Sequence, residues 1–275
     1  DALPILLLET CYNTSARYYR YDFLDNNCAT KIKDIIYDGT KGRIDFSKAN
    51  FGGKTYRQLL QPFLKKDYWI DFGLNFILGL KTDEKANANQ YMFLPIYIHD
   101  FLADSEFADE STVILDASPK KKDGINFSYI SPWIIAIALS LLILWRKTRK
   151  FMLYFLSSIF ALLGVFILAL GLYSEHEAVT ANLNMLWTLP SLFVLILGHT
   201  KKIGKYIKFG YLILMLLHFL NWFWLPQQLS TSFLPWMLLM TMALAFNLEV
   251  WRWVKCCKRP FDLLRLRSAR VAQEP

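Results

Sequence analysis

The second half of the chain consists of long apolar runs separated by short polar connections, and this pattern restricts the fold more than any other feature. A helix needs about 20 apolar residues to cross the roughly 30 Å hydrocarbon core of a bilayer. Five runs approach or reach this length, with Pro190 in the shortest one: 125–145, 151–173, 183–199, 206–225 and 231–251. We therefore predict a helical polytopic membrane domain of about five transmembrane helices over residues 125–251.

The connections between these runs alternate in charge. The chain has 31 Lys and Arg against 23 Asp and Glu, and the basic excess lies in the apolar half. Lys and Arg occupy 146–150, 200–205 and the tail 252–275, whereas 174–182 and 226–230 carry none. Cytoplasmic connections are enriched in Lys and Arg. The sequence thus predicts a cytoplasmic tail, and an N-terminal half on the opposite side of the membrane.

Residues 1–124 have the pattern of short helices joined by polar turns. Apolar residues at helical spacing predict helices over 28–37, 55–64, 69–80 and 90–102, the last broken or bent at Pro95. We expect three regions: this domain at 1–124, the membrane domain at 125–251 and the basic tail at 252–275.

Cys28 carries the most reactive chemistry in this domain. Asn27 is a good N-cap, so Cys28 is expected in the first turn of a helix, where free N–H groups and the helix dipole favour a thiolate. Lys31 and Lys33 add positive charge nearby. A thiolate is a nucleophile for acyl transfer when a His serves as its base. The alternative is a small buried thiol without chemistry.

The segment Tyr19–Asp34, with Asn27-Cys28-Ala29-Thr30 at its centre, resembles the cysteine signature of the Lnb family, the lipoprotein N-acyltransferases of Bacteroides-type bacteria. Further matches follow in order along the chain: 55–57, 69–73, 78–79 with Asp83, 90–95, and the outer loop with His176, Asn182 and Asn184.

The resemblance implies a periplasmic domain similar to a circularly permuted papain-like α+β thiol fold, of which residues 1–124 hold the helical part. In such a domain the base His precedes the Cys. No His occurs before His99, so we expect the base to lie before residue 1, in an N-terminally truncated chain that is inactive as given. The family pattern adds supporting site residues to Cys28: Asn27, Thr30, Arg57, Asp83, His176, Asn182 and Asn184. Arg57 and Asp83 match without a chemical role that the sequence assigns.

The activity that the resemblance implies is lipoprotein N-acylation. Cys28 would take an acyl chain from a membrane lipid as a thioester, and the α-amine of a diacylated lipoprotein's N-terminal Cys would then accept it. The expected location is the bacterial inner membrane, with a periplasmic N-terminal domain. The expected partners are membrane lipids and diacylated lipoproteins.

Other features narrow the chemistry. His176 could bind a head group or assist proton transfer, or it could be a solvated loop residue between Glu175 and Glu177. Adjacent side chains point in different directions and no second ligand cluster occurs, so no metal is expected, and no cofactor. The basic blocks alternate with apolar runs rather than gathering on one soluble face, so no nucleic-acid partner is expected. Phosphate-loop and zinc-peptidase patterns do not occur.

Two rival functions remain open. A papain-like cell-envelope thiol peptidase or amidase would use the same Cys in a water-filled polar cleft, whereas an acyltransferase needs an apolar slot. A non-enzymatic membrane scaffold or a transporter is the other. Transport predicts polar residues spread along several spans, which this sequence does not show.

Overall fold

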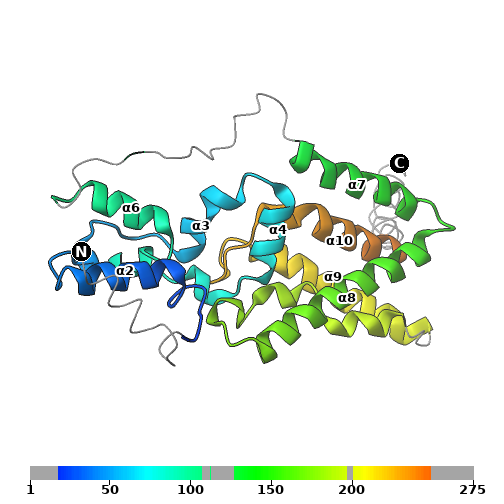
Figure 1. Cartoon of the computed structure of the whole chain (residues 1–275). Coiled ribbons are helices and arrows are strands. Elements are labelled where there is room, and N and C mark those ends of the chain that lie inside the picture. Colours follow the sequence, from blue (N-terminus) through cyan, green and yellow to red (C-terminus); the bar gives the residue numbers. More distant parts are fainter. Residues whose placement is uncertain (1–17, 107–111, 113–126, 197–200, 249–275) are drawn as a thin grey trace, which may run out of the picture. The chain divides into compact units, whose positions relative to one another are not determined.

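The computed structural model describes residues 18–106, 112, 127–196 and 201–248, and in these the chain is mainly helical (Figure 1). The described residues contain no β-strand, only two isolated bridges. The predicted basic tail 252–275 lies outside them, as do residues 107–111 and 113–126. The chain divides into two compact units: a first unit of 1–126, 167–183 and 226–228, and a second unit of 127–166, 184–225 and 229–275.

The first unit contains the predicted short helices, and several of them begin after a polar N-cap. Asn27, Thr55 and Asp67 cap α2, α3 and α4 with their side chains. Such caps satisfy the free N–H groups of a first turn. The elements of this unit are α2 (Cys28–Gly39), η2 (Phe46–Lys48), α3 (Tyr56–Leu64), α4 (Tyr68–Ile77), η3 (Leu80–Asp83), α5 (Ala88–Tyr91), α6 (Pro95–Ala103) and η4 (Glu177–Val179). The helices predicted over 28–37 and 55–64 are confirmed.

Two predicted helices differ in detail. The segment 90–102 is interrupted between α5 and α6, and Pro95 begins α6, as expected of a residue that has no N–H to donate. The helix predicted over 69–80 ends early, at Ile77, because Leu78 adopts an extended conformation. The next N–H, that of Gly79, donates to the carbonyl of Ala178 at 2.7 Å instead of continuing the helix.

The core of the first unit includes a residue from the loop after α8. Ala178 is 1% exposed and packs in the cluster that contains Leu24, Tyr56 and Leu59. A second cluster joins α2 to α6 and η2 through Ala29, Ile44, Phe46, Ala49, Met92 and Ile98. The 174–183 loop, which the sequence places between two membrane spans, is thus part of this unit's apolar core.

The second unit consists of long apolar helices. Its elements are α7 (Phe127–Leu144), most of α8 (Arg149–Tyr173), η5 (Leu183–Leu186), η6 (Pro190–Leu195), α9 (Lys201–Leu220), η7 (Thr231–Phe233) and α10 (Leu234–Leu248). α10 packs against both α7 and α9. Trp187 is 1% exposed and lies between the rings of Phe160 and Phe233, each 5.4 Å away between centroids.

Four stretches of the described residues are long and apolar enough to cross a membrane: Phe127–Leu144, Arg149–Tyr173, Glu177–Leu195 and Thr231–Leu248. The predicted span 183–199 corresponds to the third, where the chain forms short 3-10 turns rather than one α-helix, and Pro190 starts η6. α9 covers most of the predicted span 206–225 but ends at Leu220, and it is not among the four. The chain is a helical membrane protein with several spans.

Candidate functional site

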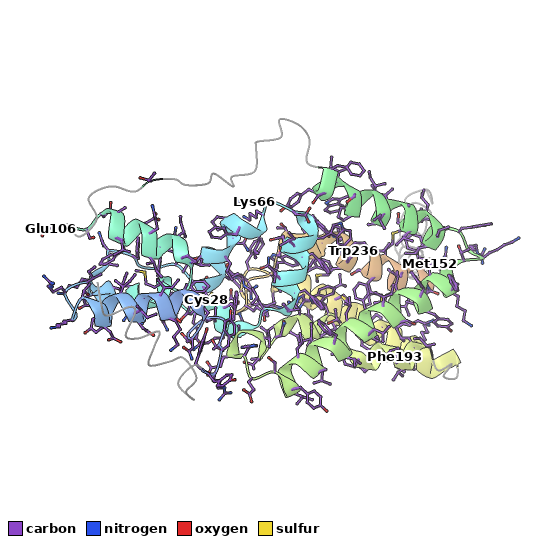
Figure 2. All side chains as sticks on the ribbon, viewed as in Figure 1. Cys28, Lys66, Glu106, Met152, Phe193 and Trp236 are labelled. Atoms are coloured by element: carbon purple, nitrogen blue, oxygen red, sulfur yellow. The ribbon has the colours of Figure 1, made fainter. Side chains whose placement is uncertain are left out.

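Cys28 is the first residue of α2, and its side chain is exposed (Figure 2). Asn27 and Thr30 hold this helix start in place. The Asn27 side chain accepts from the Thr30 N–H at 3.0 Å, and the Thr30 hydroxyl accepts from the Asn27 N–H at 2.9 Å. This reciprocal pair is a capping box. It leaves Cys28 at the positive end of the helix dipole.

Asn27 also ties the helix start to the rest of the first unit. Its side-chain amide donates to the carbonyls of Phe23 and Phe93, both at 2.9 Å. Asn27 and Thr30 are each 5% exposed. These two predicted site residues therefore position Cys28 rather than contact solvent themselves.

A tight turn before Asn27 presents a carboxylate beside the helix start. The main chains of Asp22 and Asn26 exchange two hydrogen bonds, of 3.0 and 3.2 Å. One oxygen of Asp22, Oδ1, accepts from the N–H groups of Leu24 and Asp25. Burial alone would raise the pKa of Asp22, but these two N–H groups and His176 together lower it below its ordinary value. Asp22 is thus a fixed, ionised side chain.

His176 faces the other oxygen of this carboxylate. Its Nδ1 lies 3.6 Å from Asp22 Oδ2 and makes no hydrogen bond. Its ring also meets the ring of Tyr21 edge-on, with 6.0 Å between centroids. Burial and the neighbouring Cys28 both raise the pKa of Tyr21. Tyr21 contacts His176.

The surface next to Cys28 is apolar. Ile32 and Ile35 follow Cys28 at helical spacing on α2 and are 50% and 46% exposed. Tyr19 and Tyr21 are also exposed, and the ammonium of Lys31 lies 5.2 Å from the centroid of the Tyr19 ring. The thiol therefore has hydrophobic and aromatic side chains beside it rather than a purely polar surface.

Arg57 and Asp83 form a second polar cluster, which is buried. The guanidinium is 1% exposed and binds both Asp83 oxygens, at 2.9 and 3.0 Å. It also donates to Asn75 Oδ1 at 2.9 Å and to the carbonyls of Leu78 and Gly79. With this bidentate pair and the further acceptors, all three guanidinium nitrogens are engaged in hydrogen bonds. These contacts fix α3, α4 and η3 together.

Asn182 extends this cluster to the loop after α8. Its amide donates to the carbonyls of Phe76 and Ile77 and so closes the end of α4. Gln227 donates to Asn182 Oδ1 and to the Leu78 carbonyl, both at 3.2 Å, and accepts from the N–H of Leu183. The 174–183 loop and residue 227 are therefore bonded directly to α4.

Asn184 lies apart from both clusters, in the second unit. It is fully buried, and its Oδ1 accepts from the indole N–H of Trp187 at 3.1 Å. Its carbonyl accepts from the Thr188 hydroxyl at 2.8 Å. Asn184 thus shapes the turns of η5.

The predicted site residues separate into three groups. Asn27, Thr30 and His176 lie around Cys28 or its preceding turn, Arg57, Asp83 and Asn182 form the buried cluster, and Asn184 stabilises the second unit. The sequence analysis missed Asp22, Asn75 and Gln227. Asp22 stands inside the cysteine signature, six residues before Cys28, which was a usable signal. The other two gave none, because an isolated amide in a helix or loop has no distinguishing pattern.

Within the described ranges, no three His, Cys, Asp or Glu side chains are grouped so that they could hold a metal ion.

Comparison with known proteins gives a family match for the membrane half of the chain. Residues 126–252 match the protein-family model described as the Lnb transmembrane domain. A search of curated proteins and a search of solved structures gave no match. Over residues 126–252, the chain therefore contains a domain similar to the Lnb transmembrane domain.

Proposed function

We propose that this protein is a lipoprotein N-acyltransferase whose nucleophile is Cys28. One observation carries the proposal: an exposed thiol at the first position of a fully capped helix, in a chain whose membrane domain is similar to the Lnb transmembrane domain. The helix start favours the thiolate, and the capping box holds the sulfur in one place. A fixed, exposed thiolate is suited to covalent catalysis.

In the first half-reaction the Cys28 thiolate attacks an ester carbonyl of a membrane lipid. A C–S bond forms, the ester C–O bond breaks, and the lipid oxygen leaves with a proton as an alcohol. The product is a thioester on Cys28. In the second, the α-amine of a lipoprotein's N-terminal Cys attacks the thioester, loses a proton, and releases the thiolate. An amide is more stable than a thioester, so this step is downhill.

The apolar surface beside Cys28 favours acyl transfer over peptide hydrolysis. Ile32, Ile35, Tyr19 and Tyr21 offer exposed apolar contacts to a hydrocarbon chain. Burying an acyl chain against such side chains is favourable by roughly 25 cal/mol per Å² of apolar surface. A peptidase cleft would present polar groups for the substrate backbone at this position.

The proposed setting is the bacterial inner membrane. The alternation of basic and non-basic connections supports a cytoplasmic C-terminus and a periplasmic first unit. Both acyl donor and acceptor are then lipids of the same membrane, held at high local concentration, which lowers the entropic cost of bringing them together.

The test is the acylation state of lipoproteins in cells that depend on the full-length protein. Cys28→Ala should leave lipoprotein N-termini as free amines by mass spectrometry, whereas Cys256→Ala, in the predicted cytoplasmic tail, should leave acylation unchanged. Full N-acylation in the Cys28→Ala strain would overturn the proposal. Release of cell-wall peptides by the purified wild-type protein, without lipoprotein acylation, would establish the thiol amidase instead.

A further inference from the structure

We infer that His176, oriented by Asp22, carries protons for the reaction at Cys28. The inference rests on the proposed acyl transfer and adds to it a residue from the loop after α8, which lies within the stretch matched to the transmembrane family. The same loop that joins membrane segments would then complete the reactive site of the first unit.

The geometry gives His176 an orientation. Nδ1 faces Asp22 Oδ2 at 3.6 Å, so the other ring nitrogen, Nε2, points away from the carboxylate. Asp22 itself cannot turn freely, because two backbone N–H groups hold its Oδ1. A carboxylate opposite Nδ1 favours the tautomer with the proton on that nitrogen, and this leaves the Nε2 lone pair open to accept one. Catalytic pairs often close to hydrogen-bond distance only when substrate binds.

The loop that carries His176 has a hydrogen bond of its own before the residue and is bonded to the rest of the first unit after it. The backbone N–H of His176 donates to the Ser174 hydroxyl at 3.2 Å. Two residues later, the buried Ala178 accepts from Gly79 at 2.7 Å. Gly79 approaches so closely that a Cβ there would lie 1.9 Å from the Thr180 carbonyl oxygen. A side chain on such an anchored loop can act with a defined geometry.

His176 lies against the turn that leads into Cys28. Its ring meets Tyr21 edge-on and faces Asp22, seven and six residues before Cys28. The side chains of this turn are accessible, since Cys28 is exposed, Tyr21 is 47% exposed and the His176 side chain is 41% exposed. We therefore place His176 beside a substrate bound at Cys28.

Both half-reactions move a proton at the reacting atoms, and His176 carries it alongside the upstream base that the family resemblance implies for Cys28. When the lipid C–O bond breaks, protonated His176 gives its Nε2 proton to the departing oxygen and becomes neutral. When the lipoprotein amine attacks the thioester, neutral His176 takes the proton that the amine loses, and the Cys28 thiolate leaves. The imidazolium is thereby restored, and Asp22 stabilises it before the first step and after the second.

Several charged groups surround His176 and bear on its pH dependence. Asp22 and Tyr21 face its ring. Glu175 pairs with Arg20 at 3.1 Å, and Glu177 lies 3.6 Å from Lys81. Lys81 is shared with Glu84, to which it lies closer, at 3.0 Å. Asp22 is the carboxylate that faces the ring itself.

The experiment compares His176→Gln with His99→Gln in the full-length protein. His99 is a matched control because it is also an exposed His with its Nδ1 beside a carboxylate, Asp100 at 3.2 Å, on α6. We expect His176→Gln to lower the rate of N-acylation at least 100-fold and to remove the limb of the pH–rate profile that imidazole protonation produces. His99→Gln should leave both unchanged.

Asp22→Asn tests the orienting residue separately. Because the backbone N–H groups require the amide oxygen at Oδ1, the amide NH₂ would face His176 Nδ1 and reverse the tautomer. We expect at least a tenfold loss of rate, mainly in kcat, with the thiol still reactive toward a maleimide.

The outcomes separate the two proposals. A Cys28→Ala protein that still acylates lipoproteins removes the proposed function, and the role of His176 with it. An inactive Cys28→Ala protein together with a His176→Gln protein of wild-type rate and pH profile refutes the inference alone. If His176→Gln loses rate but keeps the pH limb, His176 has only a structural role, and the inference is again refuted.

Discussion

The first unit contains two polar clusters that differ in how fully their hydrogen-bonding capacity is used. The Arg57 cluster (Arg57, Asn75, Asp83, Asn182 and Gln227) is interior, and its guanidinium is bonded to two side chains and two carbonyls. The Cys28 turn (Asp22, Tyr21, Cys28 and His176) is partly exposed. His176 Nδ1, a buried atom that faces Asp22, makes no hydrogen bond, and the proton-carrying atom proposed above is the other ring nitrogen, Nε2.

The difference shows how a structural polar cluster can be told from a reactive one in the same unit. A buried charge is stable only when every donor and acceptor is matched, so a structural cluster has nothing left for a ligand. A reactive cluster must keep an atom free for the substrate. Arg57 and Asp83, to which the sequence assigned no role, thus belong to the scaffold. Mutations in the Arg57 cluster should lower stability, whereas mutations at the Cys28 turn should lower activity.

The largest expected effect on stability is at Arg57. Arg57→Met would leave the Asp83 carboxylate, 4% exposed, without its countercharge. Loss of one partner of a buried pair costs about 3–5 kcal/mol. Thermal unfolding of the detergent-solubilised protein should show a large drop in Tm. Cys28→Ala should leave Tm unchanged while abolishing acylation.

A double variant sharpens this contrast. Arg57→Met combined with Asp83→Leu removes both charges and should recover much of the lost stability. If the single variant had the Tm of the wild type, or the double variant had a lower Tm than the single one, Arg57 would not be a structural cation.

Gly79→Ala should have the next largest effect, and it links the two clusters. The added Cβ would lie 1.9 Å from the Thr180 carbonyl oxygen, a backbone atom that can move only if the 174–183 loop moves. We expect a cost of about 2–3 kcal/mol, typical of overpacking, and a lower acylation rate because His176 lies on that loop. Gly73→Ala is the control, since no atom lies within 4 Å of its Cβ position. Equal behaviour of the two variants would contradict the anchoring of the loop.

The sequence predicted the parts of this fold that depend on local pattern. Asn27 before an apolar helical repeat located α2, and Pro95 located the break before α6. Local sequence patterns could not predict the long-range contacts. The early end of α4 depends on a hydrogen bond from Gly79 to a loop about 100 residues later. Asp22 becomes a candidate site residue only because the fold brings His176 to face it. The 3-10 turns between Glu177 and Leu195 likewise depend on packing, because Gly164 of α8 allows the Thr188 carbonyl to approach.

Asn27→Ala should have a smaller effect that is shared between stability and reactivity. The variant loses the N-cap and two hydrogen bonds to the carbonyls of Phe23 and Phe93. The cap alone contributes about 1 kcal/mol, so we expect a total loss of about 2 kcal/mol. The rate of Cys28 alkylation by iodoacetamide should fall, since the first turn of α2 frays. Asn87→Ala, which removes the same capping box from α5, should lower stability without changing the alkylation rate. Unchanged alkylation of Cys28 in Asn27→Ala would show that the helix start does not activate the thiol.

The smallest expected effect is the pH-dependent stability contributed by Asp22. Its pKa in the folded protein is lowered from an ordinary value of 3.8, so the carboxylate stabilises the fold when ionised. This contribution is complete above the ordinary pKa and is lost as the pH falls through the lower, folded-state pKa. At pH 7, Asp22→Asn should therefore have a slightly lower Tm than the wild type. The loss in free energy of unfolding should be ~1 kcal/mol or less, because the side chain is partly exposed. The difference in Tm between the wild type and Asp22→Asn should narrow below pH 3.8, as the wild-type carboxyl is protonated. A gap in Tm that stays constant from pH 7 to pH 3 would mean that the turn needs only a hydrogen-bond acceptor at position 22, and that its charge matters for His176 alone.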